Sequence, residues 1–247
     1  MVMKGGILLA IRYHSARFTR DIDFSTNRKV EEVDLERFVR ELSDSVRRVG
    51  ADNEYGLALA VQSHMLKPRH HKGSTPTFPT LQVTIGYANR ASRPEMRRLQ
   101  VGQAPSTVQL DYSFNEWASA VEQHALDGGT LTMYAYHDLI AEKLRAVLQQ
   151  PLRNRSRFQD IYDLCLLLEQ AEPSAADKRS ILDKLHAASS EREVPMNPGA
   201  LRDPTLKALS RRGHAELAAL VPGNAPDFDS AFGTLRAFYE SLPWPVP

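Results

Sequence analysis

The chain has 247 residues, of which 42% are hydrophobic and 25% charged, so it is long enough to bury one large core or two small ones. Its formal net charge of +1 excludes a strong overall bias toward acid or base, and no apolar run approaches the ~18 residues of a membrane span. The single cysteine, Cys165, excludes an internal disulfide. The apolar residues 7–11 are too few for a signal-peptide core. These features predict a cytoplasmic protein without a membrane partner.

The most informative segment lies near the N-terminus. A Lys-Gly-Gly turn, residues 4–6, is followed one helix length later by two acids on an apolar run, Asp21 and Asp23. If the run is a strand, both carboxylates lie on one face and the apolar residues are buried on the other. Carboxylate oxygens are ligands that Mg²⁺ prefers, and glycine at a helix N-terminus lets backbone N–H groups approach a phosphate. The segment therefore predicts a site for a divalent metal and a nucleotide.

The middle of the chain combines one helix with strands. Apolar residues at helical spacing predict an amphipathic helix over residues 31–48, ending at Gly50. Alternating patterns predict strands over residues 55–61 and 81–87, joined as an antiparallel hairpin. This part therefore supplies a sheet and a helix that covers it.

The segment from His64 to Arg98 is basic, with Glu95 as its one acid. Its cations are Lys67, Arg69, Lys72, Arg90, Arg93, Arg97 and Arg98. Such a region either grips a polyanion such as RNA or forms solvated loops, and the sequence leaves both interpretations open. Three histidines lie in the same segment without a cysteine or acid at zinc-site spacing, so zinc is not expected.

A further predicted strand, residues 107–114, carries a single acid, Asp111. An aspartate is unfavourable within a strand unless another interaction recovers its cost, which favours a third metal-binding carboxylate. The alternative is an exposed residue on a polar face. Glu116, just beyond the strand, is the substitute candidate.

From residue 136 onward the pattern is helical, with helices expected over residues 137–149, 157–169, 174–190, 204–220 and 227–242. Lys143 borders the apolar stripe of the first helix and either extends to solvent or holds an anion. Arg157, Asp160 and Asp163 are spaced three apart, on one face opposite much of the leucine-rich stripe of the second. They form either an ion-pair ladder or part of a site.

Four short blocks occur in order along the chain: Lys-Gly-Gly (4–6), Arg-Phe-Thr-Arg-Asp-Ile-Asp-Phe (17–24), Glu-Lys-Leu-Arg-Ala (142–146) and Arg-Phe-Gln-Asp-Ile-Tyr-Asp-Leu (157–164). In this order the blocks resemble the AbiEii/AbiGii family of nucleotidyltransferase toxins, over roughly the first two thirds of the chain. The resemblance implies an α+β fold, in which a nucleotidyltransferase-type core with a mixed sheet and flanking helices (residues 1–135) precedes a C-terminal helical bundle (residues 136–247).

The resemblance also implies an activity. The toxin would transfer a nucleoside monophosphate from an NTP to an acceptor hydroxyl, on an RNA such as a tRNA end, with Mg²⁺ or Mn²⁺ and a cognate antitoxin. The implied catalytic residues are Asp21, Asp23, Asp111, Lys143 and Asp163, of which the first three would bind metal. The implied nucleotide-binding residues are Lys4, Gly5, Gly6, Arg17, Thr19, Lys143, Arg157 and Asp160.

One position departs from the family pattern. Ile7 stands where these toxins usually carry a threonine or serine after the two glycines. This departure keeps open a catalytically weak scaffold that binds RNA or a partner protein. A separate alternative is a transferase that modifies a small molecule such as an aminoglycoside.

Overall fold

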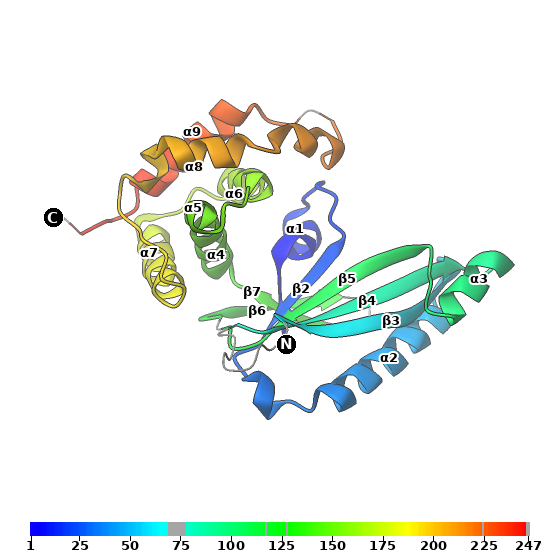
Figure 1. The fold of residues 1–247 in the computed structure, drawn as a ribbon. Helices are drawn as coiled ribbons and strands as arrows, with labels where there is room; N and C mark the ends of the chain where they lie inside the picture. Colours follow the sequence, from blue (N-terminus) through cyan, green and yellow to red (C-terminus); the bar gives the residue numbers. More distant parts are fainter. Residues whose placement is uncertain (69–77, 117, 127, 224, 246–247) are drawn as a thin grey trace. The chain divides into compact units, whose positions relative to one another are not determined.

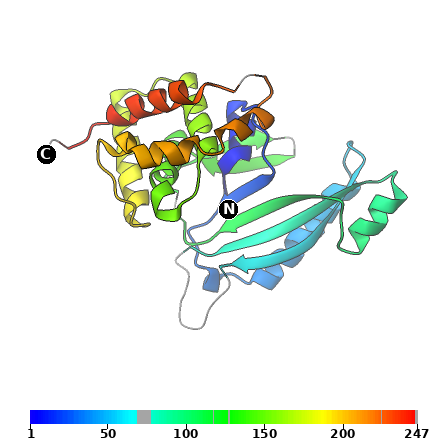
Figure 2. The ribbon, with the colours of Figure 1, turned by 45° about the horizontal axis from the view of Figure 1, so that its top comes forward.

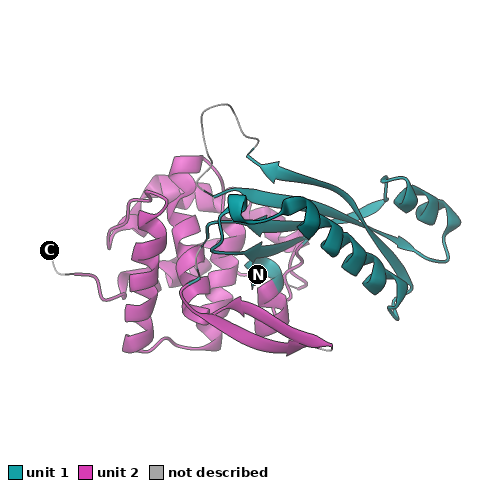
Figure 3. Cartoon of the chain, turned by 90° about the horizontal axis from the view of Figure 1, so that it is seen from below, with its two compact units in different colours: residues 1–7, 20–118 teal, residues 8–19, 119–247 magenta. Residues whose placement is uncertain are grey.

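The computed structural model describes residues 1–68, 78–116, 118–126, 128–223 and 225–245. The chain forms two compact units: the first comprises residues 1–7 and 20–118, and the second residues 8–19 and 119–247 (Figure 3). The second unit includes residues 8–19 and 119–135, which the sequence-based division assigned to the N-terminal domain. That division into domains stays a prediction.

The first unit contains five strands of a mixed sheet: β1 (Val2–Lys4), β2 (Asp21–Ser25), β3 (Leu57–Lys67), β4 (Thr80–Asn89) and β5 (Ser106–Ser113). Their order is β3-β4-β5-β2-β1, with β2 and β5 parallel and the other neighbours antiparallel (Figure 1). The expected hairpin of β3 and β4 is confirmed. The sequence placed the first of these strands at residues 55–61, but β3 runs on to Lys67. Its pairing shifts between Val61 and Ser63, and the residues that follow are largely exposed, so regular alternation is lost.

Helices cover the apolar face of this sheet. The helix α2 (Leu35–Ala51) begins later than the sequence suggested, because the Asp34 carboxylate caps it by accepting a hydrogen bond from the Arg37 N–H; a 3₁₀ turn, η1 (Val30–Glu32), precedes it. The Phe38 ring of α2 stacks on Tyr112 of β5 at 5.2 Å. The sequence analysis missed the helix α3 (Arg93–Gln100), which is short and mostly polar. These contacts leave the opposite face of the sheet for polar side chains.

The second unit is mainly helical (Figure 2). The helix α1 (Gly5–Tyr13) begins in the first unit and continues here. A hairpin of β6 (Val121–Leu126) and β7 (Gly129–Tyr134), which the sequence analysis did not identify, precedes the remaining helices. These are α4 (Tyr136–Leu148), α5 (Gln150–Arg153), α6 (Phe158–Gln170), α7 (Ala175–Ser190), the 3₁₀ turn η2 (Ala200–Arg202), α8 (Pro204–Arg211), the 3₁₀ turn η3 (His214–Ala219) and α9 (Phe228–Glu240).

The core of the second unit is apolar and includes Leu144, Ile161 and Tyr239. The single helix expected over residues 204–220 is wrong, since Gly213 takes a φ of +87° and separates α8 from η3. Cys165 is buried as expected, and burial raises the pKa of its thiol to about 12, so it is an unreactive part of the core. None of the helices in the described ranges is long and apolar enough to cross a membrane.

Candidate active-site residues

Three carboxylates lie on one face of the sheet in the first unit. β2 carries Asp21 and Asp23, and β5 carries Asp111, which pairs directly with Asp23 in the parallel register. Directly paired residues of neighbouring strands point to the same side, and so do residues two apart on one strand. The opposite face contains the buried side chains of Phe24 and Tyr112. The structure thus places the predicted acids on a common polar face.

The start of α1 lies against Asp23. Gly5 has a φ of +74°, and a Cβ added there would lie 2.0 Å from the Asp23 Oδ2 atom. Glycine is therefore required here both for its backbone conformation and for the close approach of the carboxylate. The turn brings the first backbone N–H groups of a helix close to the acidic face, as the Lys-Gly-Gly motif predicted.

Replacing Gly5 by alanine is expected to destabilise the protein more than the same change at Gly56. Both glycines have positive φ, +74° and +65°, but a Cβ on Gly56 meets nothing within 4 Å. Backbone strain should thus be common to both variants, whereas only Gly5→Ala adds a clash with Asp23, at a cost of about 1–3 kcal/mol. Urea unfolding of the two variants measures the difference. Equal loss of stability would show that Asp23 does not occupy the space next to Gly5.

The two outer candidates of this face pair with each other. The Lys4 Nζ atom donates to the Glu116 Oε2 atom at 2.7 Å, and Lys4 is the antiparallel partner of Asp23 on β1. Glu116 is buried, with an exposed fraction of 7%. Lys4 therefore places a positive charge at the edge of the acidic face, and Glu116 holds it there.

The carboxylate of Asp111 is oriented by Gln82, which the sequence analysis missed. The Gln82 Nε2 atom donates to the Asp111 Oδ1 atom at 3.0 Å, and the Lys67 Nζ atom donates to the Gln82 Oε1 atom at 2.6 Å. The signal was present in β4, where Thr80, Gln82 and Thr84 alternate with buried apolar residues. The partner of Gln82 could not be found without the register of β4 and β5.

A second group of charged residues lies in the second unit. The Lys143 Nζ atom of α4 donates to the Asp160 Oδ1 atom at 2.9 Å and to the Asp163 Oδ2 atom at 2.8 Å, both on α6. Arg17 donates to both oxygens of Asp163, each at 2.8 Å. The Arg157 guanidinium lies 3.8 Å from Asp160. The structure thus brings together Arg17 of the second sequence block, Lys143 of the third, and the three charged residues predicted from the fourth.

Lys143 and Asp163, at the centre of this group, are buried and carry opposite charges. Burial by itself would raise the pKa of Asp163, but the charges and hydrogen bonds of Lys143 and Arg17 outweigh it and hold the pKa below its ordinary value. Burial would likewise lower the pKa of Lys143, but Asp160 and Asp163 raise it above its ordinary value. Lys143 is therefore a permanent cation and is unsuited to act as a general base.

One expectation about α6 is wrong. The spacing of Arg157, Asp160 and Asp163 placed all three on a face opposite the core, yet the side chain of Asp163 is completely buried. The reason is that the cations of Lys143 and Arg17 meet Asp163 inside the unit and compensate the cost of burying its charge. The group is thus a cluster between separate segments of the chain rather than a ladder along one helix.

The remaining candidates are placed as follows. Thr19 lies in the second unit, between α1 and β2, and Gly6 follows Gly5 in the first turn of α1. Of the histidine group, His70 and His71 lie outside the described residues, as do Arg69 and Lys72 of the basic segment.

The donor set on the acidic face suits a hard divalent cation. Within the described ranges, no three His, Cys, Asp or Glu side chains form a group that could hold a metal by themselves. Mg²⁺ commonly binds through one or two carboxylates and completes its octahedron with water and substrate phosphates. Asp21 and Asp23 on one strand fit that mode, in which the protein supplies only part of the coordination.

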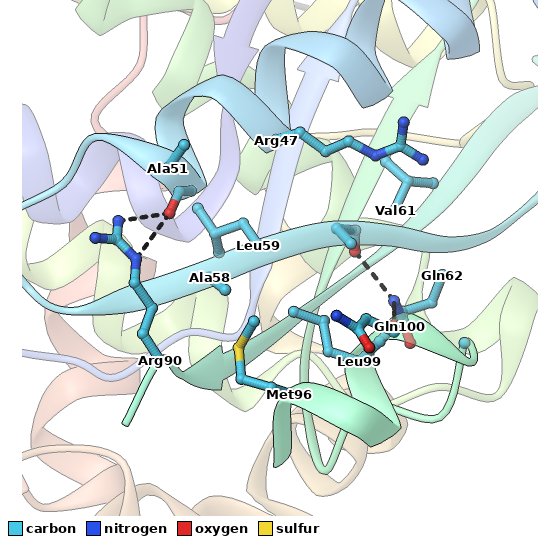
Figure 4. A pocket seen from close by; sticks show the side chains of 13 residues that line it. Arg47, Ala51, Ala58, Leu59, Val61, Gln62, Arg90, Met96, Leu99 and Gln100 are labelled. Atoms are coloured by element: carbon cyan, nitrogen blue, oxygen red, sulfur yellow. Dashed lines mark hydrogen bonds between the residues drawn. The ribbon is translucent and has the colours of Figure 1, made fainter. Parts of the chain in front are cut away.

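A pocket of about 610 Å³ in the first unit contains none of the predicted metal-binding or nucleotide-binding residues (Figure 4). It lies among α2, β3 and α3, and its lining includes Leu59, Val61, Met96 and Leu99. The Arg90 guanidinium at its wall donates to the Gly50 carbonyl, at 2.5 Å from Nη2. The pocket thus lies apart from the predicted nucleotide-binding residues of its unit.

Together, the mixed sheet with its acidic face and the helical second unit define an α+β protein of the nucleotidyltransferase type. The model of a family described as "Nucleotidyl transferase AbiEii toxin, Type IV TA system" matches residues 1–234, and the chain therefore belongs to this family. The resemblance inferred from the four sequence blocks is confirmed.

A solved structure shows the same fold. The crystal structure of JHP933 from Helicobacter pylori is 17% identical, with a TM-score of 0.50 over 98% of this chain and 82% of that one. A second H. pylori structure, described as a candidate nucleotidyltransferase, is 18% identical, with a TM-score of 0.49 over 98% of this chain and 85% of that one. No curated protein matches the chain.

Proposed function

We propose that the protein transfers a nucleoside monophosphate from an NTP to an acceptor hydroxyl on RNA, at a tRNA end, with Mg²⁺ or Mn²⁺. The observation that carries the proposal is the placement of Asp21, Asp23 and Asp111 on one face of the sheet, with the glycine start of α1 against Asp23. Membership of a nucleotidyltransferase family supports the same reaction.

In the proposed reaction, the acceptor oxygen forms a bond to the α-phosphorus of the NTP, and the bond from that phosphorus to the pyrophosphate oxygen breaks. Asp21 and Asp23 would hold the metal, which when bound neutralises charge that develops on the phosphates. Asp111, held in orientation by Gln82, would be the carboxylate that binds the metal next to the attacking hydroxyl, and the proton of that hydroxyl would pass to solvent water. The protein mainly positions charge, as in phosphoryl transfer generally.

Cations and backbone donors would bind the nucleotide. We assign the leaving pyrophosphate to the N–H groups of Gly5 and Gly6 in the first unit. In the second unit, the family resemblance assigns a contact with the nucleotide to Lys143, whose ammonium stays protonated. Arg17, Thr19, Lys4, Arg157 and Asp160 complete the proposed nucleotide-binding set, and Asp163 supports it by fixing Arg17 and Lys143. In this scheme the buried carboxylates of α6 act by holding cations in place.

The family further leads us to propose a toxin that a cognate antitoxin neutralises. Expression of the chain in bacteria is expected to arrest growth, and Asp21→Asn is expected to relieve the arrest completely. Asp21 is exposed, so this change should spare the fold. The matched control is Asp44→Asn, an exposed acid on α2 of the same unit, which should remain toxic.

Colony counts and protein levels after induction measure the effect. Equal toxicity of the Asp21→Asn variant and the wild type would contradict the proposal. An absence of arrest by the wild type, together with measurable RNA or NTP binding, would favour the scaffold or the small-molecule transferase.

A further inference from the structure

The connection between α4 and α6 forms a basic feature of the second unit. A pocket of about 400 Å³ lies there, and its lining consists of Ala146, Gln149, Gln150, Arg153, Arg155 and Arg157. Five of the six lining residues are polar, and none is acidic or aromatic. The pocket therefore offers hydrogen-bond donors and positive charge, but no ring on which a base could stack.

The pocket has a fixed frame. Gln150 is buried, with an exposed fraction of 1%, and its Nε2 atom donates to the Val147 carbonyl at 3.1 Å and to the Ser210 hydroxyl at 2.7 Å. Its Oε1 atom accepts from the Arg157 N–H at 2.8 Å. Asn154 takes the left-handed conformation, with φ of +45°, and turns the chain between the arginines. One buried side chain thus ties α5, the following loop and α8 together.

The charge of this pocket is not neutralised. Arg153 and Arg155 form no ion pair among the described residues, and Arg157 meets an acid only at 3.8 Å, at Asp160. The Gln149 Oε1 atom accepts a hydrogen bond from Arg145 at 2.6 Å, and the Gln149 N–H groups can donate to a ligand. Three like charges around one hollow repel one another, and an anion bound between them relieves that repulsion.

We propose that this pocket binds the phosphate backbone of the RNA acceptor through Arg153 and Arg155, an inference that rests on the proposed function. Arginine presents a planar fork of donors that matches phosphate oxygens in a bidentate manner. Because the lining has no aromatic side chain on which a base could stack, we expect the pocket to recognise phosphates and to bind RNA of different base sequences. The triphosphate of an NTP presents the same phosphate oxygens, so the experiment has to distinguish binding of RNA from binding of an NTP.

The test compares two double variants of the full chain. Arg153→Ala/Arg155→Ala removes two exposed pocket cations, and the control Arg179→Ala/Arg236→Ala removes two exposed cations elsewhere in the same unit. Fluorescence anisotropy measures binding of labelled tRNA over a series of salt concentrations, and a fluorescent NTP analogue measures nucleotide binding. Arg153→Lys/Arg155→Lys retains the charge but not the fork and should bind tRNA with intermediate affinity.

The pocket variant is expected to bind tRNA about 10-fold or more weakly near physiological salt. Its slope of log K against log salt should fall by roughly 1.5–2, because two phosphate contacts are lost. Binding of the NTP analogue should be unchanged in this variant, and the control should match the wild type in both assays.

Unchanged tRNA affinity, or a loss of affinity confined to the NTP analogue, would overturn the assignment. These outcomes are distinct from failure of the proposed function, since the assays require no transfer reaction. Wild-type protein that labels RNA while the pocket variant keeps full tRNA affinity would refute the pocket and leave the transferase proposal standing.

Discussion

Replacing Asp163 by asparagine is expected to lower the free energy of unfolding by about 3–5 kcal/mol, because it leaves two buried cations without their anion. Asp163 is completely buried and accepts hydrogen bonds from Arg17 and Lys143. Such a loss corresponds to a fall in Tm of roughly 6–20 °C for a chain of this size. The matched control is Asp160→Asn, whose side chain is 13% exposed, accepts a hydrogen bond from Lys143 and lies 3.8 Å from Arg157; the loss of stability in this variant should be clearly smaller.

The stabilisation by Asp163 should also depend on pH. The pKa of Asp163 is lowered from its ordinary value of 3.8, so its contribution is present above that pH and is lost as the pH falls through the lowered value. Urea unfolding of the wild type and the Asp163→Asn variant should thus differ most near neutral pH and converge below about pH 4. Equal stability of the two proteins at pH 7 would show that the cluster is not held by this carboxylate.

Replacing Asp23 by asparagine is expected to reduce nucleotidyl transfer at least about 100-fold, since even residues that only support a metal ligand typically contribute 10–100-fold. The change removes one negative charge from the acidic face and retains the size of the side chain beside Gly5. The rate of pyrophosphate release in the presence of Mg²⁺ and RNA measures the effect.

The fold of the Asp23→Asn variant is expected to remain intact, because Asp23 is only half-buried and Asn occupies the same space. Thermal unfolding of the variant provides the control, and its Tm should lie within a few degrees of that of the wild type. A variant that releases pyrophosphate at the wild-type rate would remove Asp23 from the proposed metal site.

Local pattern predicted the parts of the site that a single segment determines. The alternation of β2 put Asp21 and Asp23 on one face, and the two glycines marked the start of α1 next to it. Spacing along the chain also located Lys143 and the two acids of α6 on helices. Periodicity and glycine conformation depend on residues that are close together in the chain, so both can be identified from a single sequence.

Contacts between distant segments could not be predicted in this way. The bond from Gln82 to Asp111 depends on the register of β4 against β5, and the pair of Lys4 and Glu116 joins residues 112 positions apart. The burial of Asp163 depends on cations from α4 and from the segment after α1. Pairing of this kind follows from tertiary packing, which overrides local preference.

The strand β6 was missed for a related reason. Most residues of β6 are exposed, and its sequence lacks the alternation of apolar and polar residues by which a half-buried strand is identified. The helix α3 has a similar character, since Leu99 is its single buried residue. Elements that bury few side chains leave a weak pattern in the sequence.

The central claim is that the acidic face of the sheet supports transfer of a nucleoside monophosphate to RNA. The most direct measurement incubates the protein with Mg²⁺, total tRNA and each of the four NTPs, labelled in turn on the α- or the γ-phosphate. We expect label on RNA from one or more α-labelled NTPs, none from the γ-labelled ones, and none with the Asp23→Asn variant. Label from a γ-phosphate, or no label on RNA from any NTP, would contradict the claim.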